Sequence, residues 1–355
     1  MAKKITLNKD HSLKLLCKEL YKQMGFCTHY EVLLRTKSYI SSYKTHDISD
    51  IDVLGYKFNS DLSLFKIGSE CKSGESSALE ELFKFLGVFD YYKLDRGYLI
   101  KSKIHQNARE VAIKNGIRCF TEAEIRQLLL GFGIDIEKKL SIENAKYLKL
   151  TRSLASFKEK NDKLIEYLKF DFWNKEDWKN IHNIIHLFSN PSSNLLFKDQ
   201  EVKSSEKQVF YHTLELFSYS LLFIIGQSMV LNYSDVKSSI NNSLYGGAES
   251  LNEKRKIHDL VSQATSNNDS FEPNWHSDLI NISTRLSEST YASSKIPEMI
   301  QYIIENSFYE SKVSIKSEDI KDFPDLTRKF TQDLMHFLTK HCGLEKEIFE
   351  DFMKL

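Results

Sequence analysis

The stretch 45–75 reads THDISDIDVLGYKFNSDLSLFKIGSECKSGE, and it decides the fold. It contains two short runs typical of β-strands, Ile51–Tyr56 and Leu64–Lys72, with a polar turn between them. Side chains at positions i and i+2 of a strand point to the same face. Glu70 and Lys72 are therefore expected to emerge together on one face of the second strand.

One carboxylate, that of Asp52, stands among apolar neighbours in the first of these strands. A carboxylate left unpaired in a buried strand costs several kcal/mol by the usual desolvation figures, so Asp52 needs a cation. If the two strands are neighbours, Asp52 joins Glu70 and Lys72, and two carboxylates roughly 4–6 Å apart favour a hard divalent cation. Mg²⁺ typically takes one or two protein carboxylates plus phosphate oxygens, and Mn²⁺ substitutes for it. The stretch therefore predicts a metal site at one edge of a sheet, at the mouth of a cleft.

This arrangement resembles the core motif of the PD-(D/E)XK nucleases, the restriction-endonuclease-like superfamily. The residues that carry the resemblance are Asp52 and Glu70-Cys71-Lys72, with the run Asp50-Ile51-Asp52-Val53-Leu54 around the first acid. The resemblance implies that Asp52 and Glu70 hold Mg²⁺ and that the main-chain carbonyl of Cys71 adds a ligand, while its side chain faces the core. It implies that Lys72 orients or activates the attacking water, with Asp50 as an accessory acid.

Hydrophobic periodicity around the motif predicts the element order αβββαβαβα, which implies a mixed sheet between helices. The helix after the motif is expected to open with a capping box formed by Ser77 and Glu80. The predicted elements are a helix over His11–Met24, a strand over Cys27–Lys37, the two motif strands, a helix over Leu79–Leu94, a strand over Gly97–Lys101, a helix over His105–Asn115, a strand over Ile117–Phe120 and a helix over Glu122–Leu130.

The resemblance continues beyond the motif and covers about residues 11–132. Relatives often carry an acid on the first helix, and Glu19 is the acid within that helix here, with Glu31 on the first strand as a second candidate. The segments that are similar to the tail of the Mrr-like branch are Asn107–Ala112, Gly116-Ile117, Glu124-Ile125 and Leu128-Leu129.

From about residue 141 the alternating β-type pattern gives way to helical periodicity. The sequence therefore predicts two domains, an α/β nuclease domain over residues 1–140 and a mainly α-helical domain over residues 141–355 for oligomerisation, partner binding or regulation. The most apolar run, Tyr219–Leu231, is too short to span a bilayer and predicts a buried helix. Further predicted helices cover Asn161–Tyr167, Trp178–Phe188, Val209–Leu231, Ile296–Ser307 and Phe323–Lys340.

The charge of the chain is unevenly distributed. The whole chain has 49 basic and 49 acidic residues; residues 1–150 contain 25 and 19 of these, which leaves 24 and 30 for the remainder. A basic first half suits a polyanionic substrate, and an acidic second half suits a protein partner or a second copy of the chain. Five scattered cysteines without a C-x-x-C pair are typical of reduced thiols. The N-terminal residues also lack an apolar signal region, so a cytoplasmic protein without membrane contact is expected.

Other groups of residues in the sequence say less about its function. Lys101 and Lys103 follow a predicted strand near the motif and are expected to contact nucleic-acid phosphates. His182 and His186 have i,i+4 spacing without a third ligand, so they are interpreted as surface or partner-contacting residues. No G-x-x-x-x-G-K-[ST] motif occurs, which excludes a P-loop nucleotide site in this sequence.

The sequence and the resemblance together predict a Mg²⁺-dependent endonuclease that hydrolyses phosphodiester bonds, with DNA as the substrate. Nucleases paired with helical domains are frequent in bacterial defence against phage and plasmids, a role that rests on family analogy. One alternative is a catalytically inactive nucleic-acid-binding or assembly protein on the same scaffold. Another is a nuclease that cuts RNA, which the lack of an aromatic-rich run in the first 150 residues disfavours.

Overall fold

The structure is a computed structural model, and it describes residues 10–37, 45–158, 162–189, 200–265, 270–307 and 320–344. The chain divides into two compact units. The first comprises Met1–Lys57, Leu64–Ala155 and Lys169–Asn174, and the second comprises Phe58–Ser63, Ser156–Leu168 and Lys175–Leu355. Each unit is described by itself below.

The first unit has the predicted element order αβββαβαβα, so this prediction is confirmed. The second strand is longer than its apolar run because its first residues pair with the end of the first strand, Thr45 opposite Lys37. The elements are α1 (His11–Gln23), β1 (Cys27–Lys37), β2 (Thr45–Phe58), β3 (Leu64–Lys72), α2 (Ala78–Tyr92), β4 (Arg96–Lys101), α3 (Gln106–Lys114), β5 (Ile117–Thr121) and α4 (Glu122–Gly131).

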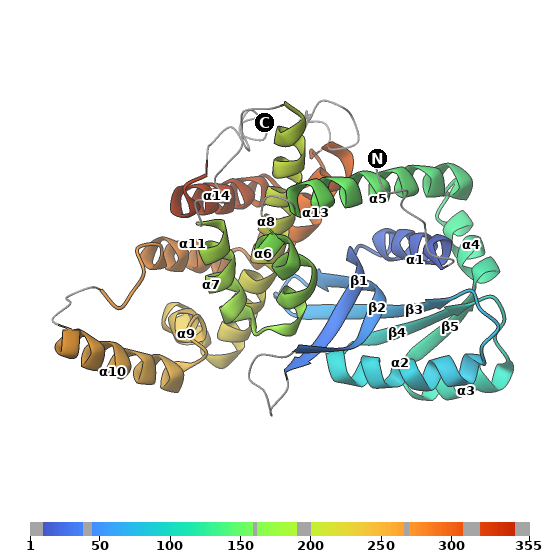
Figure 1. Cartoon of the computed structure of the whole chain (residues 1–355), viewed down its shortest axis with the longest axis horizontal. Coiled ribbons are helices and arrows are strands. Elements are labelled where there is room, and N and C mark those ends of the chain that lie inside the picture. Colours follow the sequence, from blue (N-terminus) through green and yellow to red (C-terminus); the bar gives the residue numbers. More distant parts are fainter. Residues whose placement is uncertain are drawn as a thin grey trace. The chain divides into compact units, whose positions relative to one another are not determined.

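These strands form one mixed sheet in the order β1-β2-β3-β4-β5. β1 and β2 are antiparallel, whereas β3, β4 and β5 are parallel neighbours. Parallel neighbours require crossover connections, and α2 and α3 provide them. Figure 1 shows α1 and α4 on one face of the sheet and α2 and α3 on the other. The expected α/β architecture, a mixed sheet flanked by helices, is therefore present in the first unit.

The main core of the first unit lies between the sheet and the α1 face. The spacing of Leu13, Leu16 and Leu20 turns one side of α1 toward the strands, as its periodicity predicts. The core consists of Leu13, Leu16, Cys17, Leu20, Tyr21, Phe26, Val53, Ile67, Cys71, Tyr98, Ile100, Ile125, Leu129 and Ile136. Because β3 contributes Ile67 and Cys71 to this core, its alternate residues are directed away from it.

The prediction of a capping box at the start of α2 is wrong. Ser77 makes no side-chain cap hydrogen bond there, and the carboxylate of Glu80 pairs with Lys84, one turn further on, at 2.8 Å. A capping box does form at the start of α4. Its partners are Thr121 and Glu124, and each bonds the backbone of the other.

The predicted domain boundary at residues 140/141 falls inside a helix, α5 (Ile136–Lys158). Within the first unit, the buried carboxylate of Glu143 contacts Lys18 and Lys22 of α1, at 3.2 Å and 3.5 Å. Asn144 also lies 3.1 Å from the imidazole of His11. These contacts explain why the first unit extends to Ala155.

The second part of the chain is mainly helical, as expected. Its apolar run lies in α8, and Lys207–Leu231 would be long and apolar enough to cross a membrane, but 72% of its most apolar window is buried in the protein. The elements are α6 (Asp162–Glu166), the π-helical turn η1 (Tyr167–Asp171), η2 (Phe172–Asn174), α7 (Asp177–Phe188), α8 (Gln200–Leu231), η3 (Tyr233–Asp235), α9 (Val236–Ser243), α10 (Ala248–Thr265), α11 (His276–Glu288), α12 (Thr290–Ser294), α13 (Ile296–Ser307) and α14 (Asp325–Cys342).

Candidate active site

Asp52 lies in the buried part of β2, where it is 2% exposed. Its Oδ2 accepts a hydrogen bond from the backbone N–H of Cys71 on β3, at 2.7 Å. Its Oδ1 lies 2.8 Å from the ammonium of Lys14, which comes from α1. The carboxylate that the sequence singled out is thus buried and paired, as the desolvation argument requires.

Glu70 and Lys72 emerge on the same face of β3. The ammonium of Lys72 lies 2.8 Å from the Glu70 carboxylate and 3.7 Å from the carboxylate of Asp52. One ammonium therefore contacts both acids, so the two carboxylates lie on the same side of the sheet. Cys71 points the other way, into the core, where its Sγ lies 3.8 Å from the hydroxyl of Ser69.

Burial and repulsion set the charge states at this site. Burial, followed by the negative charge of Asp52, raises the pKa of Glu70 to about 7, and Asp50 adds a smaller contribution in the same direction. Burial also lowers the pKa of the Lys72 ammonium, but its hydrogen bond to Glu70 and the charge of Asp52 outweigh that effect, so the pKa is raised overall. Lys72 is consequently a cation at neutral pH, able to stabilise an oxyanion but not to take a proton from water.

The raised pKa of Glu70 predicts a pH-dependent affinity for divalent cations. A metal ligand must be deprotonated, so protons compete with the metal below about pH 7. We expect Mn²⁺ to bind about tenfold more weakly at about pH 6 than at about pH 8, because each pH unit below the pKa costs a factor of about ten. Calorimetric titration at the two pH values measures this. Equal affinities would contradict it, and Glu70→Gln should remove the difference.

The same shift predicts how the stability of the metal-free protein changes with pH. The folded-state pKa of Glu70 is raised from 4.5 to about 7, so the folded protein holds a proton that the unfolded chain releases in that window. The contribution of Glu70 to the free energy of unfolding is therefore intact at low pH and is lost as the pH rises through about 7.

The donor set fits a hard divalent cation. Asp52 and Glu70 offer carboxylate oxygens from two neighbouring strands, and the side chains are 3% and 14% exposed. Oxygen ligands are those that Mg²⁺ and Mn²⁺ prefer. The thiol of Cys71 is no ligand, because burial raises its pKa well above the ordinary value and the side chain faces the core. The ligand role of its main-chain carbonyl stays a prediction.

The other predicted site residues fall in different places. Glu19 is 1% exposed and lies among Lys22 and Lys139, on the α5 side of α1, so the structure does not bring it to Asp52. Lys101 is buried, and its ammonium bonds the carbonyl of Gly74 and the hydroxyl of Ser76 at 3.1 Å. These bonds tie β4 to the loop after β3, and the buried ammonium is not exposed for contact with a phosphate. Lys103 is exposed.

Sequence reasoning missed one residue of this cluster. Lys14 is 4% exposed, and its ammonium lies 2.8 Å from Asp52 and 2.8 Å from the carboxylate of Glu31. The available signal was its place beside Leu13 and Leu16, one step from the buried stripe of α1, where a lysine needs a carboxylate partner. Glu31, the second-choice acid, therefore lies in the cluster, whereas Glu19 does not.

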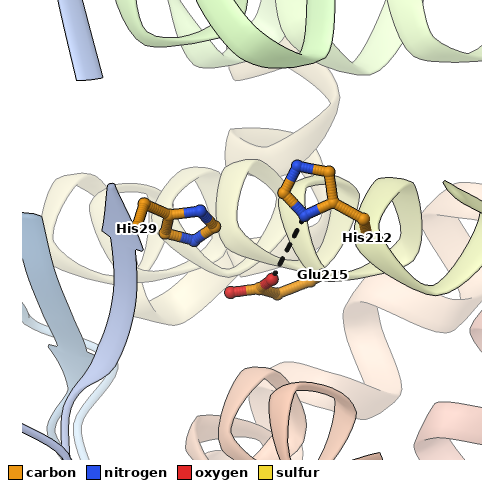
Figure 2. A group of neighbouring side chains, drawn as sticks. All are labelled: His29, His212 and Glu215. Carbon is orange, nitrogen blue, oxygen red and sulfur yellow. Dashed lines mark ion pairs between the residues drawn. The ribbon is translucent and has the colours of Figure 1, made fainter. Parts of the chain in front are cut away.

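The helical unit offers no comparable catalytic set among its described residues. The Nε2 atom of His182 lies 3.0 Å from the carbonyl of Leu244, and burial lowers the pKa of this imidazole; His186 is exposed. Figure 2 shows an i,i+3 pair on α8, where the Nδ1 atom of His212 lies 3.7 Å from the buried carboxylate of Glu215. These pairs are interpreted as structural contacts of the helices.

A cavity of about 430 Å³ lies beside α9 and α11 in the same unit. His276 lines it, and burial lowers the pKa of this imidazole while its Nδ1 lies 3.4 Å from Glu272. The cavity has the size of a small-ligand pocket but presents no nucleophile paired with a base. Its lining residues are Asp235, Lys237, Ser238, Asn241, Glu272, His276, Ser277, Ile280 and Asn281.

Among the described residues, the candidate catalytic set therefore lies where β2, β3 and α1 meet in the first unit. Comparisons with protein-family models, with curated proteins and with solved structures found no match to this chain. The function of the site is accordingly inferred from its own residues and their contacts.

Proposed function

We propose that the protein is a metal-dependent nuclease of the PD-(D/E)XK, restriction-endonuclease-like type, which hydrolyses phosphodiester bonds in DNA. The single observation that carries the proposal is that the carboxylates of Asp52 and Glu70 share the ammonium of Lys72, at 3.7 Å and 2.8 Å. Two acids and a lysine from neighbouring strands of a mixed sheet are a set suited to metal-assisted phosphodiester hydrolysis.

Each side chain has a distinct role in this proposal. Asp52 and Glu70 hold Mg²⁺, or Mn²⁺ in its place. A divalent cation in such a site lowers the pKa of bound water and neutralises charge on the phosphate. Lys72, a cation in the metal-free protein, orients the attacking water and stabilises the negative charge that develops on the phosphate oxygens.

The charge of the first part of the chain supports a nucleic acid as the substrate. The excess of basic residues in the first 150 positions and the exposed Lys103 favour a nucleic acid. DNA is the favoured substrate. A single-stranded or RNA substrate is supported by a specific observation, since Phe83 and Tyr91 are 59% and 53% exposed on α2, and exposed aromatic rings stack on unpaired bases.

A different class of function is a nucleic-acid-binding or assembly protein that keeps the scaffold and performs no chemistry. Against it stands the complete set of Asp52, Glu70 and Lys72, with the pKa of Glu70 raised as it is in functional sites. The helical unit is proposed to bind a protein partner or a second copy of the chain. We also propose that the protein acts in the cytoplasm, as part of a bacterial defence system.

The test is an incubation of the full-length protein with supercoiled plasmid, circular single-stranded DNA and single-stranded RNA, with Mg²⁺ or Mn²⁺ and then with EDTA. Nicking or linearisation of plasmid that EDTA stops is the expected result. Cleavage of RNA alone would make RNA, and not DNA, the substrate. Binding of nucleic acid without cleavage of any substrate would favour the inactive scaffold.

A further inference from the structure

Lys14 occupies an unusual position for a lysine. It lies in the first turn of α1, is 4% exposed, and places its ammonium between two carboxylates from two strands, Asp52 on β2 and Glu31 on β1. Both Nζ–O distances are 2.8 Å. Lysine is almost never buried to this degree unless it is paired, and here the pairing joins α1 to the predicted metal ligand.

Glu31 reaches this position through an irregular backbone. In the β1–β2 register, Tyr30 faces Val53 and Val32 faces Ile51, so Glu31 is the residue opposite Asp52, although the two form no ladder pair. Its φ of 52° lies in the left-handed region, which is costly for a residue with a Cβ. The resulting geometry brings the carboxylate of Glu31 to the same ammonium as that of Asp52.

We propose that the ammonium of Lys14 stands, in the metal-free protein, at a place between Asp52 and Glu31 where a divalent cation binds, and that Glu31 is a carboxylate ligand there together with Oδ1 of Asp52, whose Oδ2 faces Lys72 and Glu70. This inference rests on the proposed metal site. A point 2.8 Å from oxygen atoms of two carboxylates needs a contraction of only about 0.7 Å to reach the Mg²⁺–oxygen distance of about 2.1 Å.

The charges of the cluster agree with this exchange. With Glu70 deprotonated, Asp52, Glu70 and Glu31 bring three negative charges, against two positive charges from Lys14 and Lys72. A divalent cation added beside both ammonium groups would reverse the sign of the cluster. Displacement of Lys14 instead leaves the site close to neutral, so the lysine and the metal compete for one position.

Two variants and two controls test the competition by Mn²⁺ calorimetry on the full chain. Lys14→Met keeps the length and apolar stem and should tighten Mn²⁺ binding about tenfold, whereas Glu31→Gln should weaken it about tenfold. Lys18→Met, one turn further along α1 and paired with Glu143, should leave the affinity unchanged. Glu80→Gln, an exposed acid on α2, should do the same.

A second measurement distinguishes displacement from simple loss of a nearby charge. Acetylation of the wild-type protein by N-hydroxysuccinimide acetate, with peptide mass analysis, should label Lys14 poorly without metal and more strongly with Mn²⁺, while Lys18 labelling stays constant. If wild-type protein binds Mn²⁺ but Lys14 stays unlabelled, or Glu31→Gln binds as tightly, the inference fails and the metal site stands. If neither the wild type nor Lys14→Met binds Mn²⁺, this inference and the proposed function both fail.

Discussion

Lys72→Ala should lower the rate of phosphodiester cleavage by roughly 10²- to 10³-fold while Mn²⁺ still binds. The ammonium of Lys72 is the cation that contacts both acids, at 2.8 Å from Glu70 and 3.7 Å from Asp52, yet it is not itself a metal ligand. Its removal takes away the charge that stabilises the developing oxyanion and leaves both ligands in place. Cleavage rate and Mn²⁺ affinity, measured on the same preparation, separate the two effects.

Lys84→Ala is the matched control for this variant. Lys84 is an exposed lysine of α2 whose ammonium pairs with Glu80, so its loss removes one positive charge from the same unit without touching the site. We expect its cleavage rate to equal that of the wild type. Cleavage by Lys72→Ala at a rate close to that of Lys84→Ala would show that the lysine has been assigned a role it does not have.

Asp52→Ala should lower the free energy of unfolding of the metal-free protein by about 3–5 kcal/mol. The variant leaves the ammonium of Lys14, which is 4% exposed, with only the half-exposed Glu31 as a partner. It also leaves the backbone N–H of Cys71 without its 2.7 Å acceptor. Guanidinium denaturation measures the loss.

The double variant Lys14→Met/Asp52→Leu tests the cause of this loss. Replacing both members of a buried ion pair by apolar residues of similar size is commonly neutral or stabilising. We therefore expect the double variant to recover the part of the lost stability that comes from the unpaired ammonium of Lys14, because the backbone N–H of Cys71 lacks its acceptor in both variants. If Asp52→Ala unfolds at the same denaturant concentration as the wild type, Asp52 is not the buried, paired carboxylate described above.

Element order was the part of the fold that local sequence patterns could predict. Period-two alternation in 64–72, the apolar stripe of α1 and the glycine after it each depend on a few neighbouring residues, and their elements lie where expected. The bounds of β2 were underestimated, because its first residues are held by pairing with β1 rather than by their own composition. The predicted α2 capping box is absent: Ser77 makes no side-chain cap hydrogen bond, and the Glu80 carboxylate pairs with Lys84.

At the candidate site, too, the sequence predicted the contacts between neighbouring residues but not those that depend on tertiary packing. Glu70 and Lys72 are two residues apart, so local strand geometry brings them together, and Asp52 needed only the assumption that its strand is a neighbour. Lys14 lies far from them in sequence, and its contact depends on how α1 packs on the sheet, which no local pattern encodes. Lys101 was misjudged for the same reason, because the 73–77 loop that covers it is fixed by tertiary structure.

The central claim is that Asp52 and Glu70 together hold a divalent cation, and the position of bound Mn²⁺ tests it most directly. Crystals grown with Mn²⁺ and measured near the manganese absorption edge would locate the ion by its anomalous scattering. The account predicts a peak within about 2.3 Å of carboxylate oxygens of both Asp52 and Glu70. A peak elsewhere, or none at these residues at saturating Mn²⁺, would contradict it.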